Sequence, residues 1–196
     1  MRKFKFENIE EFDSVYEIFP LLAEDKRGYI IKDYHEEVFK DNGLELPLKE
    51  VFYTKSKKGV IRAIHFQSVK PQAKLVRCIS GKIFDVIVDL RIDSPTYKKW
   101  KGFFLDESSQ ELYIPHGFGH GYLVLEDSIV SYKCDEKFYG EYDTGICWDD
   151  KDINIKWPLE EVSELILSDK DKNLQTLQEY EMNKNVFKMN IDKGIM

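Results

Sequence analysis

The chain has 196 residues, of which 42% are hydrophobic and 14% aromatic, and its formal net charge is −7. This composition supplies a sizeable core and excludes a disordered chain, and the acidic balance argues against a nucleic-acid partner, which needs a basic face. No apolar run is long enough for a transmembrane helix, so we expect no membrane partner either.

The N-terminus and the cysteines both indicate a cytoplasmic protein. The charged residues at positions 2–7 are not followed by an apolar segment, so we expect no signal peptide. The three cysteines, Cys78, Cys134 and Cys147, are odd in number and far apart, and no CxxC pair occurs. That spacing is typical of reduced thiols and not of a disulfide framework or a zinc site.

The predicted elements begin with a small helix over residues 36–41. From about residue 48 to residue 158, short apolar runs rich in β-branched and aromatic residues are separated by Gly, Pro, Asn and Asp. This pattern predicts a mainly β fold, either a sandwich or a barrel. The clearest expected strands are residues 59–67, 102–105, 111–114, 120–125 and 128–134.

The same middle region contains one predicted β-hairpin. Residues 75–79 and 83–91 flank Ser-Gly-Lys at residues 80–82, which is a turn of the hairpin type. The tail differs, because residues 159–183 are rich in Glu, Leu, Lys and Gln and predict one or two C-terminal helices. No linker divides the chain, so we expect a single domain over residues 1–196.

The apolar run at residues 59–67, which reads GVIRAIHFQ, contains one histidine, His65. Arg62 precedes it and Lys74 follows it. A neutral imidazole can remove a proton, and a nearby cation stabilises the anion that forms, so this group suits proton abstraction beside a carbonyl. Strand alternation places Arg62 on the face opposite to His65 unless a bulge re-aims it. The alternative role for His65 is that of a hydrogen-bonded structural histidine.

A metal site is a second possibility that the histidines raise. The chain has four of them, His35, His65, His116 and His120. Metal-binding β jelly rolls often carry an HxH pair, but the residue two positions after His65 is Gln67. His116 and His120 enclose a glycine-rich segment that does not suit a helix, and no acidic residue completes a ligand set. We therefore expect no metal.

Two further residues are candidates for a pocket. His120 follows the glycine-rich segment and is expected at the start of a strand, where a purely structural role is the alternative. Tyr132 alternates with Val130 and Cys134 on an apolar face, where a tyrosine usually belongs to the core. Tyr132 gains a chemical role only if it faces His65 across a pocket, where a phenol can deliver a proton.

Eight segments in a fixed order carry a resemblance to a known family. They are residues 58–67, 72–76, 81–91, 94–96, 114–121, 148–150, 155–158 and 167–171. Together they resemble the dTDP-4-dehydrorhamnose 3,5-epimerase family. The resemblance implies a cupin-type double-stranded β-helix, or jelly roll, with a core at about residues 16–175 and a short helical tail at about residues 159–196. It also implies a homodimer and a chemistry that needs neither a metal nor an organic cofactor.

The resemblance also implies a substrate and a set of catalytic roles. The substrate is a nucleotide-linked 4-keto-6-deoxyhexose, most directly dTDP-4-dehydro-6-deoxyglucose, which is epimerised at C3, C5 or both. His65 is the implied general base and Asp171 the partner of its imidazole, with Asp169 as the alternative two residues away. Lys74 would stabilise the enolate, and Tyr132 would return a proton from the opposite face.

The substrate contacts that the resemblance implies form a larger set. The predicted substrate-binding residues are Arg62, Arg27, His120, Gln67, Glu50, Phe52, Phe138, Tyr139 and Asp143. Arg62 and Arg27 match arginines near the nucleotide sugar, where a guanidinium fork suits pyrophosphate oxygens. Phe138 or Tyr139 falls where an aromatic ring stacks on the nucleotide base.

Four positions depart from the family pattern. Ala63 replaces a glycine, Glu50 and Phe52 stand where the family has Gln and Asn, and Asp143 stands where it has Glu. These positions belong to the walls of the site and not to the base, acid or lysine, so a single-centre epimerase acting on another nucleotide sugar remains an alternative. A non-catalytic sugar-nucleotide-binding protein is another. A metal-dependent cupin oxygenase or isomerase is disfavoured by the missing HxH pair.

Overall fold

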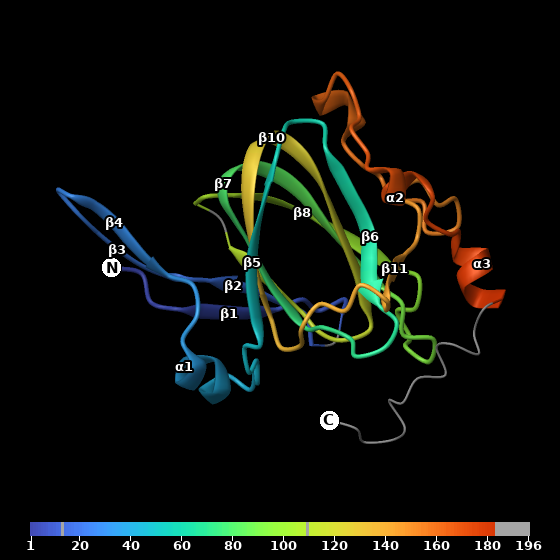
Figure 1. Cartoon of the computed structure of the whole chain (residues 1–196). Coiled ribbons are helices and arrows are strands. Elements are labelled where there is room, and N and C mark those ends of the chain that lie inside the picture. Colours follow the sequence, from blue (N-terminus) through green and yellow to red (C-terminus); the bar gives the residue numbers. More distant parts are fainter. Residues whose placement is uncertain (13, 109, 183–196) are drawn as a thin grey trace.

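The computed structural model describes residues 1–12, 14–108 and 110–182, and it is mainly β as predicted (Figure 1). Its strands are β1 (Lys5–Asn8), β2 (Tyr16–Phe19), β3 (Leu21–Asp25), β4 (Gly28–Lys32), β5 (Glu50–Ser56), β6 (Ile61–Gln67), β7 (Lys74–Asp89), β8 (Trp100–Asp106), β9 (Glu111–Ile114), β10 (Phe118–Cys134) and β11 (Asp143–Gly145). Its helices are α1 (Glu36–Asp41), the 3-10 helix η1 (Leu159–Glu161), α2 (Asp169–Lys172) and α3 (Leu177–Met182).

The long strands β7 and β10 are antiparallel partners and organise a nine-stranded sheet. The first half of β7 pairs with β9, which continues to β2 and β1, and its second half pairs with β8. β10 pairs with β6 through its first half and with β5 through its second half. Each long strand therefore has different neighbours at its two ends, and the sheet curls into the open-ended barrel seen in Figure 1.

The predicted hairpin at residues 80–82 is wrong. β7 runs through these residues without reversing, and both of its halves pair with β10. Gly81 has a φ of +83°, and a Cβ at this position would lie 2.2 Å from the backbone oxygen of Asp127. The glycine therefore permits a bend where the register of β10 shifts, and it does not close a turn. For the same reason, the predicted strands 120–125 and 128–134 are two halves of β10.

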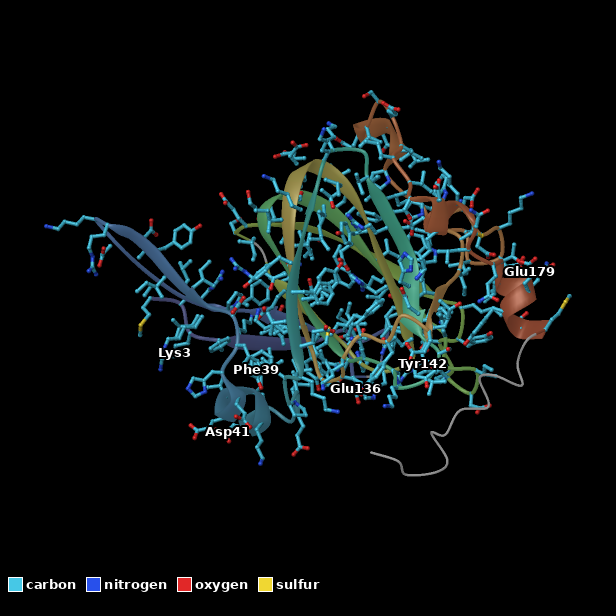
Figure 2. All side chains as sticks on the ribbon, viewed as in Figure 1. Lys3, Phe39, Asp41, Glu136, Tyr142 and Glu179 are labelled. Atoms are coloured by element: carbon cyan, nitrogen blue, oxygen red, sulfur yellow. The ribbon has the colours of Figure 1, made fainter. Side chains whose placement is uncertain are left out.

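Two apolar clusters hold the barrel and its C-terminal segment together. One fills the barrel interior with side chains from β7 and β10, among them Val76, Ile87 and Tyr122, and Figure 2 shows how densely side chains occupy that interior. The other joins β6 and β7 to the C-terminal segment, where Leu177 is fully buried. Burial of one such leucine stabilises the fold by about 1.5–3 kcal/mol, so this segment is fixed against the barrel.

The N-terminal and C-terminal helices agree with the predicted positions. α1 covers the predicted residues 36–41, and the region 159–183 contains η1 and the two short helices α2 and α3. The predicted helical tail beyond residue 182 lies outside the described residues. Within the described part of the chain, no helix is long and apolar enough to cross a membrane.

The hairpin of β3 and β4 projects away from the barrel, with no other element beside its tip (Figure 1). Tyr29 and Ile30 near that tip are 57% and 61% exposed. Large apolar side chains at the end of an isolated hairpin are typical of a surface that contacts another chain.

Candidate active site

One cavity of about 290 Å³ collects most of the predicted site residues. Its wall is built by side chains of β5, β6, β7 and β10 together with residues of the segment around α2. The predicted residues that line it are Arg62, His65, Gln67, Lys74, His120, Tyr132, Phe138, Asp143, Phe52 and Asp171. The described residues Arg27, Glu50 and Tyr139 do not line it.

A bulge between β6 and β10 brings Arg62 and His65 to the same cavity. His65 is opposite His120 and Arg62 is opposite Tyr122, so a step of three residues on β6 faces a step of two on β10. The extra residue reverses the alternation of side chains, which would otherwise place Arg62 on the far face. Both side chains line the cavity as a result.

His65 forms a dyad with Asp171. Nε2 of His65 lies 2.6 Å from Oδ1 of Asp171, and the hydroxyl of Ser168 donates a hydrogen bond to Oδ2 of the same carboxylate. Ser168 is also the N-cap of α2, because its Oγ accepts from the backbone N–H of Asp171. Burial would raise the pKa of Asp171, but the hydrogen bonds from His65 and Ser168 outweigh it and hold the pKa below its ordinary value.

The structure also distinguishes the two candidate aspartates. The side chain of Asp169 is 99% exposed and forms an ion pair with Lys172 on the surface of α2. It does not line the cavity, whereas Asp171 does. Asp171 is therefore the partner of His65.

Lys74 and Tyr132 enter the cavity from β7 and β10. Burial lowers the pKa of Lys74, and no carboxylate of the described residues forms an ion pair with its ammonium group. Tyr132 is only 7% exposed and stacks on Phe52 of the neighbouring strand, with ring centroids 4.7 Å apart. Burial raises the pKa of Tyr132 well above its ordinary value, so the phenol keeps its proton.

A second histidine–aspartate pair supports the floor of the cavity. His120 is buried, and its Nε2 lies 2.8 Å from Oδ2 of the fully buried Asp85. The His120 ring meets Tyr132 edge-on at a centroid distance of 5.7 Å. The pair therefore fixes the ring that packs against the Tyr132 phenol.

Asp143 lies on the other side of His65. Its Oδ1 is 4.0 Å from Nδ1 of His65, and its carboxylate forms an ion pair with Lys170. Lys170 lines the cavity as well, so two cationic side chains, Arg62 and Lys170, face it in addition to Lys74. The nitrogens of Arg62 donate hydrogen bonds to the hydroxyl of Ser56.

The remaining predicted binding residues lie in or beside the loop 137–139. The Gln67 amide donates to two backbone carbonyls and accepts from the Tyr139 N–H, so it fixes the loop 137–139. Glu50 accepts from the backbone N–H of Phe138. Phe138 is 53% exposed at the cavity, whereas the Tyr139 ring is engaged by the ammonium of Lys70. Phe138 is therefore the aromatic residue positioned to stack on a ligand.

Arg27 is remote from the cavity of its own chain. It lies in the turn between β3 and β4, where its guanidinium forms an ion pair with Asp25 and is largely exposed. Since that hairpin projects from the barrel, the prediction that Arg27 contacts substrate requires a second chain.

Asp150, in the acidic segment 149–152, has a structural role. Asp150 accepts hydrogen bonds from the backbone N–H groups of Ile153 and Leu177 and thereby joins two loops. A wider hollow of about 520 Å³ beside Trp148 and Trp157 contains none of the predicted site residues. Across the described ranges, no group of three or more His, Cys, Asp or Glu residues is arranged to hold a metal ion.

Sequence reasoning missed several residues of this site, among them Thr54, Asp85, Ser168 and Lys170. Thr54 shares the inner face of β5 with Phe52, which strand alternation could have indicated. Ser168 opens a short acidic helix, which is the pattern of an N-cap. The arrangement as a whole places a base, a cation and a protonated phenol around one cavity, which suits removal and return of a proton on carbon.

Comparisons with known proteins agree with this chemistry. The family model described as dTDP-4-dehydrorhamnose 3,5-epimerase matches residues 10–179. A dTDP-4-dehydrorhamnose 3,5-epimerase of Methanothermobacter thermautotrophicus is 49% identical over 181 residues, which cover 91% of this chain and 97% of that protein.

Solved structures show the same fold. A crystal structure of dTDP-6-deoxy-D-glucose-3,5-epimerase from Legionella pneumophila, in complex with dTDP-4-keto-L-rhamnose, has a TM-score of 0.85 at 31% identity and covers 90% of this chain and 94% of its own. A 3′-monoepimerase from Streptomyces bikiniensis in complex with dTDP-quinovose has a TM-score of 0.80 at 30% identity, with 86% of each chain covered. The predicted cupin-type jelly roll is thereby confirmed.

Proposed function

The chain belongs to the dTDP-4-dehydrorhamnose 3,5-epimerase family, and we propose from that premise that it converts dTDP-4-dehydro-6-deoxyglucose to dTDP-4-dehydrorhamnose by inverting C3 and C5. One observation carries the proposal. The His65–Asp171 dyad, Lys74 and Tyr132 come from four different elements of the chain and line the same cavity. The reaction is an isomerisation, because the product has the same atoms as the substrate.

His65 is the general base of this mechanism. Since the Asp171 carboxylate can only accept a hydrogen bond, Nε2 of His65 carries the hydrogen between them and Nδ1 keeps its lone pair. The ketone at C4 acidifies the hydrogens on C3 and C5, and Nδ1 removes one of them. The negative charge of Asp171 then stabilises the imidazolium that forms.

Lys74 stabilises the intermediate. Removal of the proton moves negative charge onto the C4 oxygen, and a cation already fixed beside that oxygen lowers the barrier without reorganising. Lys74 suits this role because it lies on the cavity wall and its charge is not neutralised by an ion pair with a described carboxylate. A fixed donor of this kind is worth about 10²–10³ in rate.

Tyr132 returns the proton. Its high pKa keeps the phenol protonated until the proton is transferred to an enolate carbon. Tyr132 projects from β10, whereas His65 projects from β6. A sugar held between them loses a proton to one side and gains it from the other, which inverts the centre. The same pair of steps at the second carbon completes the 3,5-epimerisation.

Each of these steps uses side chains of the protein, so the mechanism needs no metal and no organic cofactor. The nucleotide is held by charge and stacking, since Arg62 and Lys170 offer cations for the pyrophosphate and Phe138 offers an exposed ring for the base. The enzyme works in the cytoplasm in this proposal, which its free cysteines support.

A homodimer completes the site in this proposal. The β3–β4 hairpin projects from the barrel (Figure 1); it carries Arg27, which does not line the cavity of its own chain, and the exposed apolar side chains of Tyr29 and Ile30. A second copy that received this hairpin would bury those side chains and gain an arginine for the pyrophosphate. Light scattering should give twice the mass of the chain.

Mixing two inactive variants tests the shared site. Arg27→Ala homodimers lack the arginine and His65→Asn homodimers lack the base. If Arg27 of each chain completes the cavity of its partner, a mixed dimer contains one site with both Arg27 and His65. Activity should therefore recover on mixing. Activity that stays at the sum of the two separate variants would contradict the shared site.

The product of the reaction tests the function itself. Purified protein is incubated with dTDP-4-dehydro-6-deoxyglucose, and the configuration at C3 and C5 is determined by NMR. Inversion at both carbons supports the proposal. Inversion at C3 alone would make the chain a single-centre enzyme like the 3′-monoepimerase from Streptomyces bikiniensis, and tight binding without inversion would make it a sugar-nucleotide-binding protein.

A further inference from the structure

Two carboxylates flank the imidazole of His65, one beside each ring nitrogen. Asp171 is hydrogen-bonded to Nε2, whereas Oδ1 of Asp143 lies 4.0 Å from Nδ1. A hydrogen bond to a ring nitrogen spans about 2.7–3.2 Å, so Asp143 is near Nδ1 without being bonded to it. The mechanism above gives Asp171 a role and leaves Asp143 without one.

The backbone of Asp143 is fixed beside His65. β11 pairs with β6, and its residues Asp143 and Gly145 lie opposite Gln67 and His65. Rotation of the Asp143 side chain therefore decides whether its carboxylate approaches Nδ1 or turns away from it. That side chain is only 16% exposed, so water replaces a missing partner only in part.

Lys170 engages this carboxylate from the other side. Its ammonium group forms an ion pair with Oδ2 of Asp143, which is not the oxygen placed 4.0 Å from Nδ1. Lys170 directly precedes Asp171 in α2, so one short helix supplies both the partner of His65 and the partner of Asp143. All four side chains line the cavity.

The proposed base needs Asp143 to stay unbonded to Nδ1. An imidazole with a carboxylate hydrogen-bonded at each nitrogen is stabilised as the imidazolium, which has no lone pair and cannot remove a proton. Among the described residues that line the cavity, Asp143 and Asp171 are the two carboxylates. The other charged or titratable groups of the neighbouring elements are Arg62 of β6, Lys74 of β7, and His120 and Tyr132 of β10, with Asp85 buried behind His120.

We propose that Lys170 is a positioning residue that holds the Asp143 carboxylate away from Nδ1 of His65 and so keeps the base unprotonated at neutral pH. The inference rests on the proposed role of His65 as the base. An ammonium group has three donors, so Lys170 can hold Asp143 and contact a pyrophosphate at the same time. Its effect on the base is separate from phosphate binding, because it acts through Asp143.

A cycle of variants separates an effect through Asp143 from the charge of Lys170 itself. Lys170→Met frees the carboxylate to bond Nδ1, and the titration midpoint of His65 should rise by about one to two pH units. In an Asp143→Asn background there is no carboxylate to free, so adding Lys170→Met should change the midpoint little. Lys170→Arg keeps a cation for Asp143 and should titrate like the wild type.

NMR titration of protein labelled at its histidine nitrogens measures the midpoint without any turnover. The spectrum of His65→Asn identifies the His65 signals, because only those are missing. Lys172→Met is the matched control, since Lys172 is on the same helix and pairs with the exposed Asp169. Thermal unfolding shows which variants are folded, and Lys170→Gln takes the place of Lys170→Met if the latter is not.

Turnover of dTDP-4-dehydro-6-deoxyglucose gives a second measurement. The acidic limb of kcat/KM reports protonation of the free enzyme, so Lys170→Met should move that limb upward by the same interval as the midpoint. Loss of a phosphate contact alone would lower kcat/KM equally at every pH and leave the limb in place.

Two outcomes of the titration overturn the positioning role. A midpoint in Lys170→Met equal to that of the wild type would show that Asp143 stays off Nδ1 without Lys170. An equal rise with and without the Asp143 carboxylate would show that Lys170 acts by its own charge. A wild type that inverts neither carbon overturns the proposed function instead, and the titration still decides whether Lys170 positions Asp143.

Discussion

Nε2 of His65 and Oδ1 of Asp171 lie 2.6 Å apart although 106 positions separate the two residues in the sequence. His65 belongs to the barrel, whereas Asp171 belongs to the C-terminal segment that packs on the outside of it. The backbone N–H of Ile61 donates to the carbonyl of Ile166, and the N–H of Ile166 donates to the carbonyl of Gly59, so the segment is joined to the start of β6. The base therefore exists as a dyad only while the C-terminal segment is docked.

Replacement of Asp171 by Asn should lower kcat by about 10²–10⁴ and leave KM nearly unchanged. The amide keeps the size of the side chain but cannot stabilise the imidazolium of His65. Steady-state kinetics measures the effect, and Asp169→Asn is the matched control because its carboxylate is exposed and outside the cavity. An equal loss in both variants would show that charge near α2, and not the dyad, matters.

Replacement of Tyr132 by Phe should separate exchange from inversion. The base and Lys74 remain, so the substrate still loses its hydrogen and regains one from the same side. The yield of inverted product should fall by about 10²–10⁴, as measured by NMR of the product. Tyr113→Phe, which removes the hydroxyl of a buried tyrosine outside the cavity, is the control. Normal inversion by Tyr132→Phe would remove Tyr132 from the mechanism.

The alkaline side of the pH profile should report Lys74. Burial lowers its pKa, so the ammonium loses its proton, and the enolate loses its cation, at a pH below that of an ordinary lysine. We expect kcat to fall as the pH rises through that lowered pKa. Lys74→Arg stays charged throughout and should lack this decline, and Lys74→Met should lose about 10²–10³ in kcat at all pH values. An unchanged alkaline decline in Lys74→Arg would assign it to another group.

Glu111 of β9 should make the stability of the fold depend on pH. It is fully buried, and neither of its carboxylate oxygens has a hydrogen-bond partner among the described residues. Burial raises its pKa well above the ordinary value, more than the cations of Lys133 and Arg77 lower it, and Asp33 adds to the increase. The folded protein thus keeps a proton that the unfolded chain has already released.

This difference in bound protons between the folded and unfolded states fixes the sign of the pH dependence of stability. The free energy of unfolding has its full value below the unfolded pKa of Glu111 and falls as the pH rises toward the folded pKa, by about 1.4 kcal/mol for each pH unit of the interval. Glu111→Gln cannot titrate, so its unfolding free energy should fall less than that of the wild type from pH 5 to pH 8 in urea titrations. Glu107→Gln, at an exposed site, should follow the wild type. Parallel curves for all three proteins would contradict the assignment.

Much of the fold could be predicted from the sequence because strand composition and alternation are local properties. The strand at residues 111–114 and the helix at residues 36–41 were predicted with their observed bounds. The error at Gly81 arose because a left-handed glycine between two apolar runs suits a turn as well as a bend. Only the partner strand decides between them, and β10, which is nearly 50 residues later in the chain, pairs with both sides.

Site residues that lie in ordered sequence motifs could be predicted. Site residues that depend on contacts between distant parts of the chain could not. His65, Lys74 and Asp171 lie in such motifs, Tyr132 stood out by strand alternation, and the structure brings all four to one cavity. The hydroxyl of Thr54 on β5 lies 2.8 Å from that of Tyr122, 68 positions away, and no local pattern connects the two. The position of Arg27 could not be predicted either, because it depends on where a projecting hairpin ends.

The most direct test of the central claim is deuterium exchange in heavy water with dTDP-4-dehydro-6-deoxyglucose, for the wild type and for His65→Asn. NMR follows deuterium at C3 and C5. The proposed mechanism predicts uptake at both carbons by the wild type and a loss of about 10²–10⁴ in its rate in His65→Asn. Uptake at an undiminished rate in His65→Asn, or none in the wild type, would contradict it.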